Sequence, residues 1–249
     1  MSLKIGLIGG LGWPATIAYY EAICGATRID GAAGSPEMTI ESLDMAKTLA
    51  ARGKPNDDAS WAAFDRIFQE ALNNLHNSGC DIAAIASVTP HNRLASISEE
   101  SPVQIVSIVD AVVSELAGCI AKDAVVLGTS VTMQGTLFDD ALRQLGMNVR
   151  RAESAEITAH NELLEAYFYS GRADKGREAL LQYIKSAFGS NDLLCILACT
   201  DLAPAFPDKT GQVLFDVDEI TFCNATAAHV ESILAATTGN YDQVPVSGL

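Results

Sequence analysis

Short apolar runs alternate with helix-like segments along most of this chain, and that alternation constrains the fold more than any other feature. Strands are predicted at residues 4–9, 38–43, 81–86, 103–108, 124–127, 193–198 and 213–215. Helices are predicted at residues 16–26, 59–77, 134–145, 155–169, 173–188 and 218–236, with one more ending at Cys119. Strands and helices in this order build βαβ units, so the sequence predicts an α/β fold with parallel sheets.

A faint internal repeat indicates that the chain has two similar halves. The run that ends in Ser87-Val88-Thr89 resembles the run that ends in Cys199-Thr200, and residues 4–12 resemble residues 123–132. Two pseudo-symmetric α/β domains with a shared cleft would produce this repeat. We predict a first domain from residues 1–110 plus 215–249 and a second from residues 111–214, with a loose polar tail from about Thr238.

Composition excludes several classes of protein. Hydrophobic residues make up 49% of the chain, which is enough for a core and argues against disorder. The most apolar stretch, residues 104–128, is broken by charged residues, so we expect no membrane span. The net charge is −15 and Lys/Arg residues form no cluster, which argues against nucleic acid as a partner.

The chain has six cysteines, scattered and with no signal peptide before them, which is typical of reduced thiols in the cytoplasm. Cys195 and Cys199 are four residues apart, but a zinc site would need further ligands nearby. The four histidines, His76, His91, His160 and His229, are spread along the chain, so no metal is expected.

A glycine-rich turn follows the first strand and opens a helix. Gly10-x-Gly12-x-x-Ala15 matches the dinucleotide fingerprint in its glycine spacing, but Asp44 comes later than the acidic residue that the fingerprint requires. Backbone N–H groups in such a turn suit any anion, and carboxylate is favoured over phosphate at this loop. The turn could also be purely structural and bind no anion.

Polar side chains stand where later strands end, which is where open α/β sheets bind ligands. Ser87 and Thr89 follow one strand, Thr129 follows another, and Cys199 with Thr200 follows a third. The hydroxyls could equally cap helices. His91 alone is more typical of a structural histidine. Cys199 could be a buried cysteine without a catalytic role. If Cys199 lies at a helix N-terminus, the helix dipole would favour its thiolate.

These motifs together resemble the aspartate/glutamate racemase superfamily that works without pyridoxal phosphate, in particular its aspartate racemase branch. The matching parts keep the family's order from about residue 4 to 235. They are Ile5–Gly10 with Thr16 and Tyr19-Tyr20, the strand ends at 87–91 and 199–202, Leu127-Gly128-Thr129 with Thr132-Met133, and Phe215-Asp216. The resemblance implies two α/β domains, an active site between them, no cofactor and a homodimer.

The resemblance also implies the roles of the candidate residues. Family members carry a Cys-Asn-Thr-x-His motif and a Gly-Cys-Thr-Glu motif, whose cysteines face opposite sides of the substrate α-carbon. Here the second motif reads Ala198-Cys199-Thr200-Asp201, while the first reads Ser87-Val88-Thr89-Pro90-His91. Serine therefore replaces the first cysteine and valine replaces an amide. A hydroxyl is a poor base without a neighbouring base, so two-thiol racemisation is not expected.

The sequence predicts a cytoplasmic, cofactor-independent amino-acid racemase of the aspartate/glutamate type. Its catalytic residues would be Cys199 and Ser87, and its substrate-binding residues Gly10, Leu11, Gly12, Thr16, Val88, Thr89, Thr129 and Thr200. Three alternatives stay open. They are a one-cysteine decarboxylase or isomerase of a small dicarboxylate, a catalytically idle binding protein for a small acid, and a nucleotide-dependent oxidoreductase.

Overall fold

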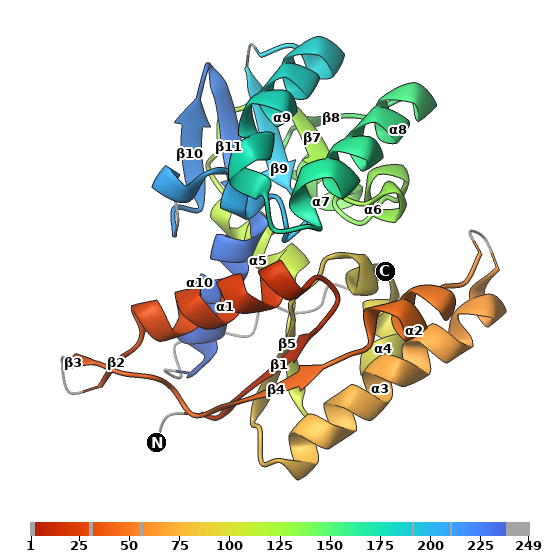
Figure 1. Ribbon diagram of the computed structural model, residues 1–249, viewed down its shortest axis with the longest axis vertical. Helices are drawn as coiled ribbons and strands as arrows, with labels where there is room; N and C mark the ends of the chain where they lie inside the picture. Colours follow the sequence, from red (N-terminus) through yellow and green to blue (C-terminus); the bar gives the residue numbers. More distant parts are fainter. Residues whose placement is uncertain (1–2, 30–31, 55–56, 191, 210, 238–249) are drawn as a thin grey trace.

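The computed structural model describes residues 3–29, 32–54, 57–190, 192–209 and 211–237. The chain forms two lobes, each built on its own sheet, with helices α5 (Ile108–Glu115) and α10 (Ala225–Thr237) between them (Figure 1). This arrangement confirms the predicted α/β fold with two mainly parallel sheets. Within the described residues, no helix is long and apolar enough to cross a membrane.

The first lobe contains a four-stranded parallel sheet. Its order is β4-β1-β5-β6, formed by Met38–Ser42, Ile5–Gly9, Ile82–Ile85 and Gln104–Val106. Its helical segments, besides α5, are α1 (Trp13–Ala26), α2 (Met45–Ala50), η1 (Asp58–Trp61), α3 (Ala62–Asn77), η2 (Thr89–Arg93) and α4 (Leu94–Ser98). A small hairpin, β2 (Arg28–Ile29) with β3 (Ala32–Ala33), follows α1.

The second lobe contains a five-stranded sheet. Its order is β10-β11-β9-β7-β8, formed by Leu214–Val217, Ile220–Asn224, Leu193–Leu197, Asp123–Leu127 and Asn148–Arg150. All neighbours are parallel except β10 and β11. Its helical segments, besides α10, are α6 (Ser130–Gln134), α7 (Asp139–Gln144), α8 (Ser154–Leu163), the π-helix η3 (Leu164–Phe168), α9 (Ala173–Phe188), η4 (Ala203–Ala205) and η5 (Pro207–Lys209).

The internal repeat in the sequence corresponds to a repeat in the sheets. The order β4-β1-β5-β6 in the first sheet has its counterpart in β8-β7-β9-β11 in the second, and all of these neighbours are parallel. The two central strands of each set, β1 with β5 and β7 with β9, carry the repeated sequences. The polar segments after β5 and after β9 therefore occupy equivalent places in the two halves.

The prediction of a single helix over residues 218–236 is wrong in its first part. Asp218 and Glu219 have φ of 50° and 67° and form the tight turn between β10 and β11. Such backbone angles suit a two-residue hairpin loop, so the chain continues as a strand before α10 begins. The second sheet consequently extends to Asn224, past the boundary predicted at residue 214.

The predicted helix over 134–145 is likewise divided, because α6 ends before Gly135 and α7 begins at Asp139.

Each half contributes a helix to the core of the other half. Helix α5 follows β6 of the first sheet, yet its side chains Ile108 and Val112 pack with Leu194 and Ile196 of the second sheet. Helix α10 follows β11 of the second sheet, yet Val230, Ile233 and Ala236 pack with Ile5 and Leu7 of the first sheet. Helices α5 and α10 also contact each other. This exchange fixes how the two sheets face one another.

A buried polar chain holds α10 in the first lobe. The Tyr19 hydroxyl lies 2.8 Å from Nδ1 of His229, and Nε2 of His229 lies 2.9 Å from the carbonyl oxygen of Val106. The carbonyl can only accept, so Nε2 carries the hydrogen and Nδ1 accepts from the tyrosine. This arrangement requires His229 to be neutral, and burial lowers its pKa to about 3.

The buried histidines make the stability of the fold depend on pH. Burial also lowers the pKa of His91 and of His160 to about 4, whereas an unfolded histidine titrates near about 6.5. Between these values the unfolded chain binds protons that the folded chain does not, so the free energy of unfolding falls as pH falls from about 6.5 to about 4. Asp201, with its pKa raised to about 6 by burial, acts in the opposite direction, as do Asp110 and Glu231, whose pKa values burial also raises.

We therefore expect the urea midpoint of unfolding, followed by circular dichroism, to decrease between about pH 7 and about pH 5. Replacing the buried His229→Gln should make this decrease less steep. Replacing the exposed His76→Gln should not change it. A free energy of unfolding that stays constant over this range would contradict the assignment of neutral buried histidines.

Candidate active site

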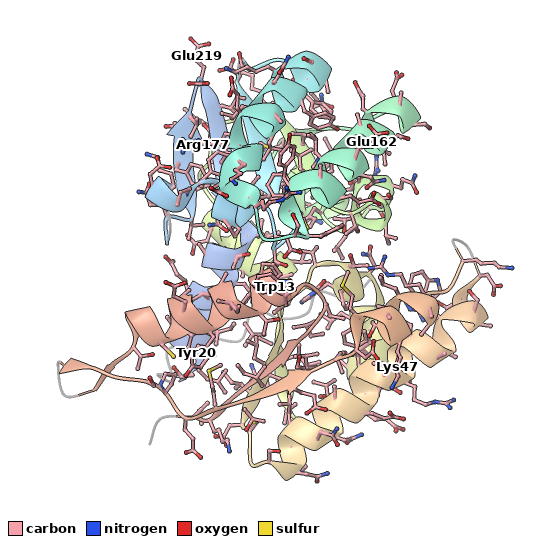
Figure 2. All side chains as sticks on the ribbon, in the orientation of Figure 1. Trp13, Tyr20, Lys47, Glu162, Arg177 and Glu219 are labelled. Carbon is pink, nitrogen blue, oxygen red and sulfur yellow. The ribbon has the colours of Figure 1, made fainter. Side chains whose placement is uncertain are left out.

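A cavity of about 270 Å³ lies between the two halves, at the carboxyl ends of the central strands. Both halves contribute to its wall, and the segments after β5, β7 and β9 supply its centre. The lining residues are Leu11, Met45, Leu49, Arg52, Ser87, Val88, Thr89, Thr129, Ser130, Val131, Asn161, Glu165, Tyr169, Ala198, Cys199, Thr200 and Asp201. Polar and titratable groups from distant parts of the sequence thus share one small space. Figure 2 shows side chains from both lobes in the region between them.

Most of the residues that the sequence singled out line this cavity. They are Leu11, Ser87, Val88, Thr89, Thr129, Cys199 and Thr200. The three remaining residues, Gly10, Gly12 and Thr16, lie outside the lining and build the loop behind it. The N–H of Gly10 donates to the Thr16 hydroxyl over 3.0 Å, so that donor is already used within the loop.

The glycine loop is shaped by close contacts with its surroundings. Gly10 has φ of +79°, and a Cβ there would lie 2.2 Å from the carbonyl oxygen of Leu43. A Cβ at Gly12 would lie 2.6 Å from Oδ2 of Asp201. The missing side chain at position 12 therefore leaves room for the Asp201 carboxyl group beneath the loop.

Hydroxyl groups join the two halves across the cavity. Thr89 Oγ1 lies 3.0 Å from Thr129 Oγ1, and the Thr200 hydroxyl donates to the carbonyl oxygen of Ala86 over 3.4 Å. Thr129 also caps α6 by accepting from the N–H of Thr132. The threonines are therefore fixed in place, and they hold the ends of β5, β7 and β9 together.

His91 fixes the segment that carries Ser87. Its Nε2 accepts a hydrogen bond from the N–H of Ile108 over 3.3 Å, so its Nδ1 donates to the carbonyl oxygen of Ser87 over 3.0 Å. His91 is buried and does not line the cavity. It positions the backbone of Ser87 rather than meeting a ligand.

Cys199 and Asp201 form a buried pair on one side of the cavity. The Cys199 thiol donates to Oδ2 of Asp201 across 3.9 Å, and both side chains are buried. Burial, followed by the neighbouring Asp201 carboxyl group, raises the pKa of the thiol well above its ordinary value. Asp201 accepts a hydrogen bond from the backbone of Ala15, while its Oδ1 is buried and has no partner among the described residues.

The prediction that a helix dipole favours the Cys199 thiolate is wrong. Strand β9 is followed by a turn, and the next helical element is the three-residue η4. Such a short segment has no appreciable macrodipole, because that dipole is a sum over aligned peptide units. The thiol is consequently protonated at rest, and any thiolate must form by transfer of its proton to a nearby base.

The structure adds two residues that sequence reasoning missed, Arg52 and Tyr169. Burial lowers the pKa of Arg52, its Nε is buried without a hydrogen-bond partner, and no carboxylate of the described residues lies within ion-pair distance of it. It is also the only Lys or Arg in the described lining of the cavity. Both residues come from segments without a recognisable motif, so only the fold brings them to the site.

The described residues do not form a cluster of metal-ligating side chains. Among the residues that the structure describes, no group of three or more His, Cys, Asp or Glu side chains could hold a metal ion. The cavity instead combines one thiol, one guanidinium, two carboxyl groups and several hydroxyls. That set suits binding of a small zwitterion or acid and transfer of a proton.

Comparisons with solved structures agree with this two-lobed fold. An aspartate racemase homologue from Pyrococcus horikoshii OT3 superimposes with a TM-score of 0.70 at 23% identity, covering 94% of this chain and 99% of that one. The aspartate racemase of Picrophilus torridus gives a TM-score of 0.73 at 16% identity, with 95% and 94% covered. These likenesses establish the class of fold.

The sequence comparison is more specific. Residues 8–233 match the family described as Asp/Glu/Hydantoin racemase, so the chain belongs to that family and is an isomerase. A curated relative, the broad specificity amino-acid racemase RacX of Bacillus subtilis (strain 168), is 26% identical over 202 residues. That match covers 80% of this chain and 85% of the relative.

Proposed function

We propose that this chain is a cofactor-independent amino-acid racemase in which Cys199 transfers the α-proton. The observation that carries the proposal is the buried Cys199–Asp201 pair facing a cavity that also holds a cation, Arg52, with no counter-ion among the described residues. A thiol can act as acid or base at a carbon atom once its proton has a place to go. The guanidinium supplies binding energy for a carboxylate that arrives with the substrate.

Asp201 is the proposed acceptor of the thiol proton. In the resting pair the proton is on sulfur and the negative charge on the carboxylate. Transfer of the proton to Oδ2 gives a thiolate and a neutral acid, so the total charge of the buried pair does not change. Keeping the charge constant avoids the cost of creating a new ion in a buried place.

The thiolate then removes the α-proton of the bound amino acid. The Cα–H bond breaks, an S–H bond forms, and the electron pair moves into the substrate carboxylate to give an enolate-like anion. The hydroxyls of Thr89, Thr129 and Thr200 are the nearby groups that can stabilise this added charge. A proton returned to the opposite face of the α-carbon completes inversion.

Ser87 is the group proposed for that opposite face. It lines the cavity from the first lobe, whereas Cys199 lines it from the second lobe. A serine hydroxyl can give a proton to a carbanion, but the alkoxide needed for the reverse role does not form in this pH range without a base. The two faces of the substrate are therefore unequal, and the enantiomer whose C–H points at Cys199 should react faster.

The substrate is proposed to be an amino acid of the aspartate/glutamate type. Arg52 can pair with one carboxylate, while the backbone and hydroxyl groups around Thr89 and Thr200 can hold another. Relatives support an amino acid in general, because one is an aspartate racemase and another a broad specificity amino-acid racemase. Aspartate and glutamate are the first compounds to test, followed by neutral and basic amino acids.

A second candidate is a one-cysteine decarboxylase of a small dicarboxylic acid. The single thiol favours it, since Cys199 is the only cysteine in the described lining and a decarboxylase protonates a carbanion from one face only. The two reactions differ in their products. Loss of carbon dioxide from a dicarboxylate, without exchange of any amino-acid α-proton, would select the decarboxylase.

Removing the thiol should remove the reaction. We expect Cys199→Ala to lower α-proton exchange by at least about 100-fold, the usual contribution of a general acid or base. Exchange is measured by proton NMR as loss of the α-proton signal of each amino acid in deuterium oxide. The buried Cys195→Ala, which does not line the cavity, serves as the matched control. Equal exchange by Cys199→Ala and wild type would exclude the thiol mechanism.

A second thiol at position 87 should make proton transfer more equal on the two faces of the substrate. In the wild-type protein we expect one enantiomer to exchange its α-proton faster than it inverts, because the proton mostly returns from Cys199 to the same face. Ser87→Cys should raise inversion relative to exchange, measured by chiral chromatography beside NMR. Val88→Asn can be added to supply an amide near the substrate. If the wild-type protein exchanges both enantiomers at similar rates, Ser87 is not the weaker half of the site.

A further inference from the structure

Tyr169 lies at the end of the π-helix η3 and lines the cavity from the second lobe. Its N–H donates to the carbonyl oxygen of Leu164 over 3.0 Å, which closes the wide turn. Phe168 beside it is fully buried in the core, and Tyr167 packs on Gly176. Wide turns of this kind are frequent at functional sites, and this one places Tyr169 in the lining of the cavity while Phe168 stays in the core.

The Tyr169 hydroxyl has no hydrogen-bond partner among the described residues, although the side chain is partly buried. Burial, then Cys199 and Asp201, and also Glu165, raise the pKa of this phenol, while Arg52 lowers it. These groups come from both lobes, so the phenol lies within electrostatic reach of both walls of the cavity. Because it stays protonated, the hydroxyl is available as a donor to an anion.

Arg52 stands on the other side of the same cavity, and its Nε also lacks a partner among the described residues. It follows helix α2 of the first lobe, and it interacts electrostatically with Tyr169. A carboxylate has two oxygens, and a guanidinium with a phenol can donate to both without a second positive charge.

We propose that Tyr169 is a substrate-binding residue that donates a hydrogen bond to the same carboxylate that pairs with Arg52. One carboxylate then joins the two lobes, because Arg52 belongs to the first and Tyr169 to the second. The inference rests on the proposed function, since it assumes that the cleft binds a carboxylic acid. It assigns Tyr169 to binding and leaves the proton transfer to Cys199.

The test compares Tyr169→Phe with Tyr167→Phe, which removes a hydroxyl from the same turn but outside the cavity lining. Succinate is titrated by calorimetry, and KM and kcat are measured with the amino acid that exchanges fastest. A hydrogen bond to a charged group strengthens binding, so Tyr169→Phe should weaken succinate binding and raise KM by about 10-fold or more. We expect kcat to change little and Tyr167→Phe to behave as wild type.

Arg52→Gln and the double variant Arg52→Gln/Tyr169→Phe complete a double-mutant cycle. If one carboxylate touches both residues, the effects on succinate binding are not additive, and the loss in the double variant is smaller than the sum of the single losses. Additive losses, unchanged KM and succinate affinity in Tyr169→Phe, or a fall confined to kcat would each overturn the proposal.

The proposed function can fail separately from this inference. If no amino acid exchanges its α-proton but succinate binds and Tyr169→Phe weakens it, the racemase assignment is wrong and the role of Tyr169 stands. If amino acids exchange and Tyr169→Phe has wild-type KM, only the role of Tyr169 is wrong. If wild type binds neither succinate nor any amino acid, both are wrong.

Discussion

The exchange of helices α5 and α10 between the two halves is the constraint on which the site depends. Each helix leaves one sheet and buries its apolar side chains against the other, so neither half completes its core alone. Burying a side chain such as Ile108 or Ile233 contributes about 1.5–3 kcal/mol, and together these contacts set the sheets with their carboxyl ends facing one cavity. The buried contact of His229 with Tyr19 and Val106 adds a directional bond to this packing.

The electrostatics of the cavity depend on that arrangement. The chain carries a net charge of −15, yet Arg52 is held in the cleft without a counter-ion from the described residues. The opposite wall holds Cys199 and Asp201, the pair proposed to pass a proton between its members while their combined charge stays constant. A bound acid would thus find a local positive group on one side and a proton-transfer pair on the other, in spite of the repulsive field of the whole molecule.

Much of the fold was predictable because it depends on local patterns. The apolar strands, the parallel order and the two similar halves are indicated by runs such as residues 82–89 and 194–200, which recur at strand ends. The hairpin over residues 214–224 was missed because a two-residue turn at Asp218 and Glu219 lacks the usual glycine or asparagine. The helix considered after Cys199 is only the three-residue η4, since the end of a strand does not by itself determine the conformation of the next segment.

The candidate site was predictable only where a motif marks it. Ser87, Thr89, Thr129, Cys199 and Thr200 stand at strand ends, and the topology of α/β sheets places such residues together. Arg52 and Tyr169 lie in segments with no such mark, and they reach the cavity only through tertiary packing. The sequence indicated an anion site at the glycines of the first loop. In the structure the N–H of Gly10 donates a hydrogen bond to the Thr16 hydroxyl, and Gly12 leaves space for the Asp201 carboxyl group.

The central claim is that one substrate spans the cleft, with one of its carboxylates at Arg52 and its α-carbon between Cys199 and Ser87. A crystal structure of the Cys199→Ala variant with a bound amino acid measures this directly. We predict a carboxylate in contact with Arg52 and an α-carbon within about 4 Å of the side chain at position 199, with Ser87 on its opposite face. An amino acid bound outside this cavity, or one with Ser87 and residue 199 on the same face, would contradict the account.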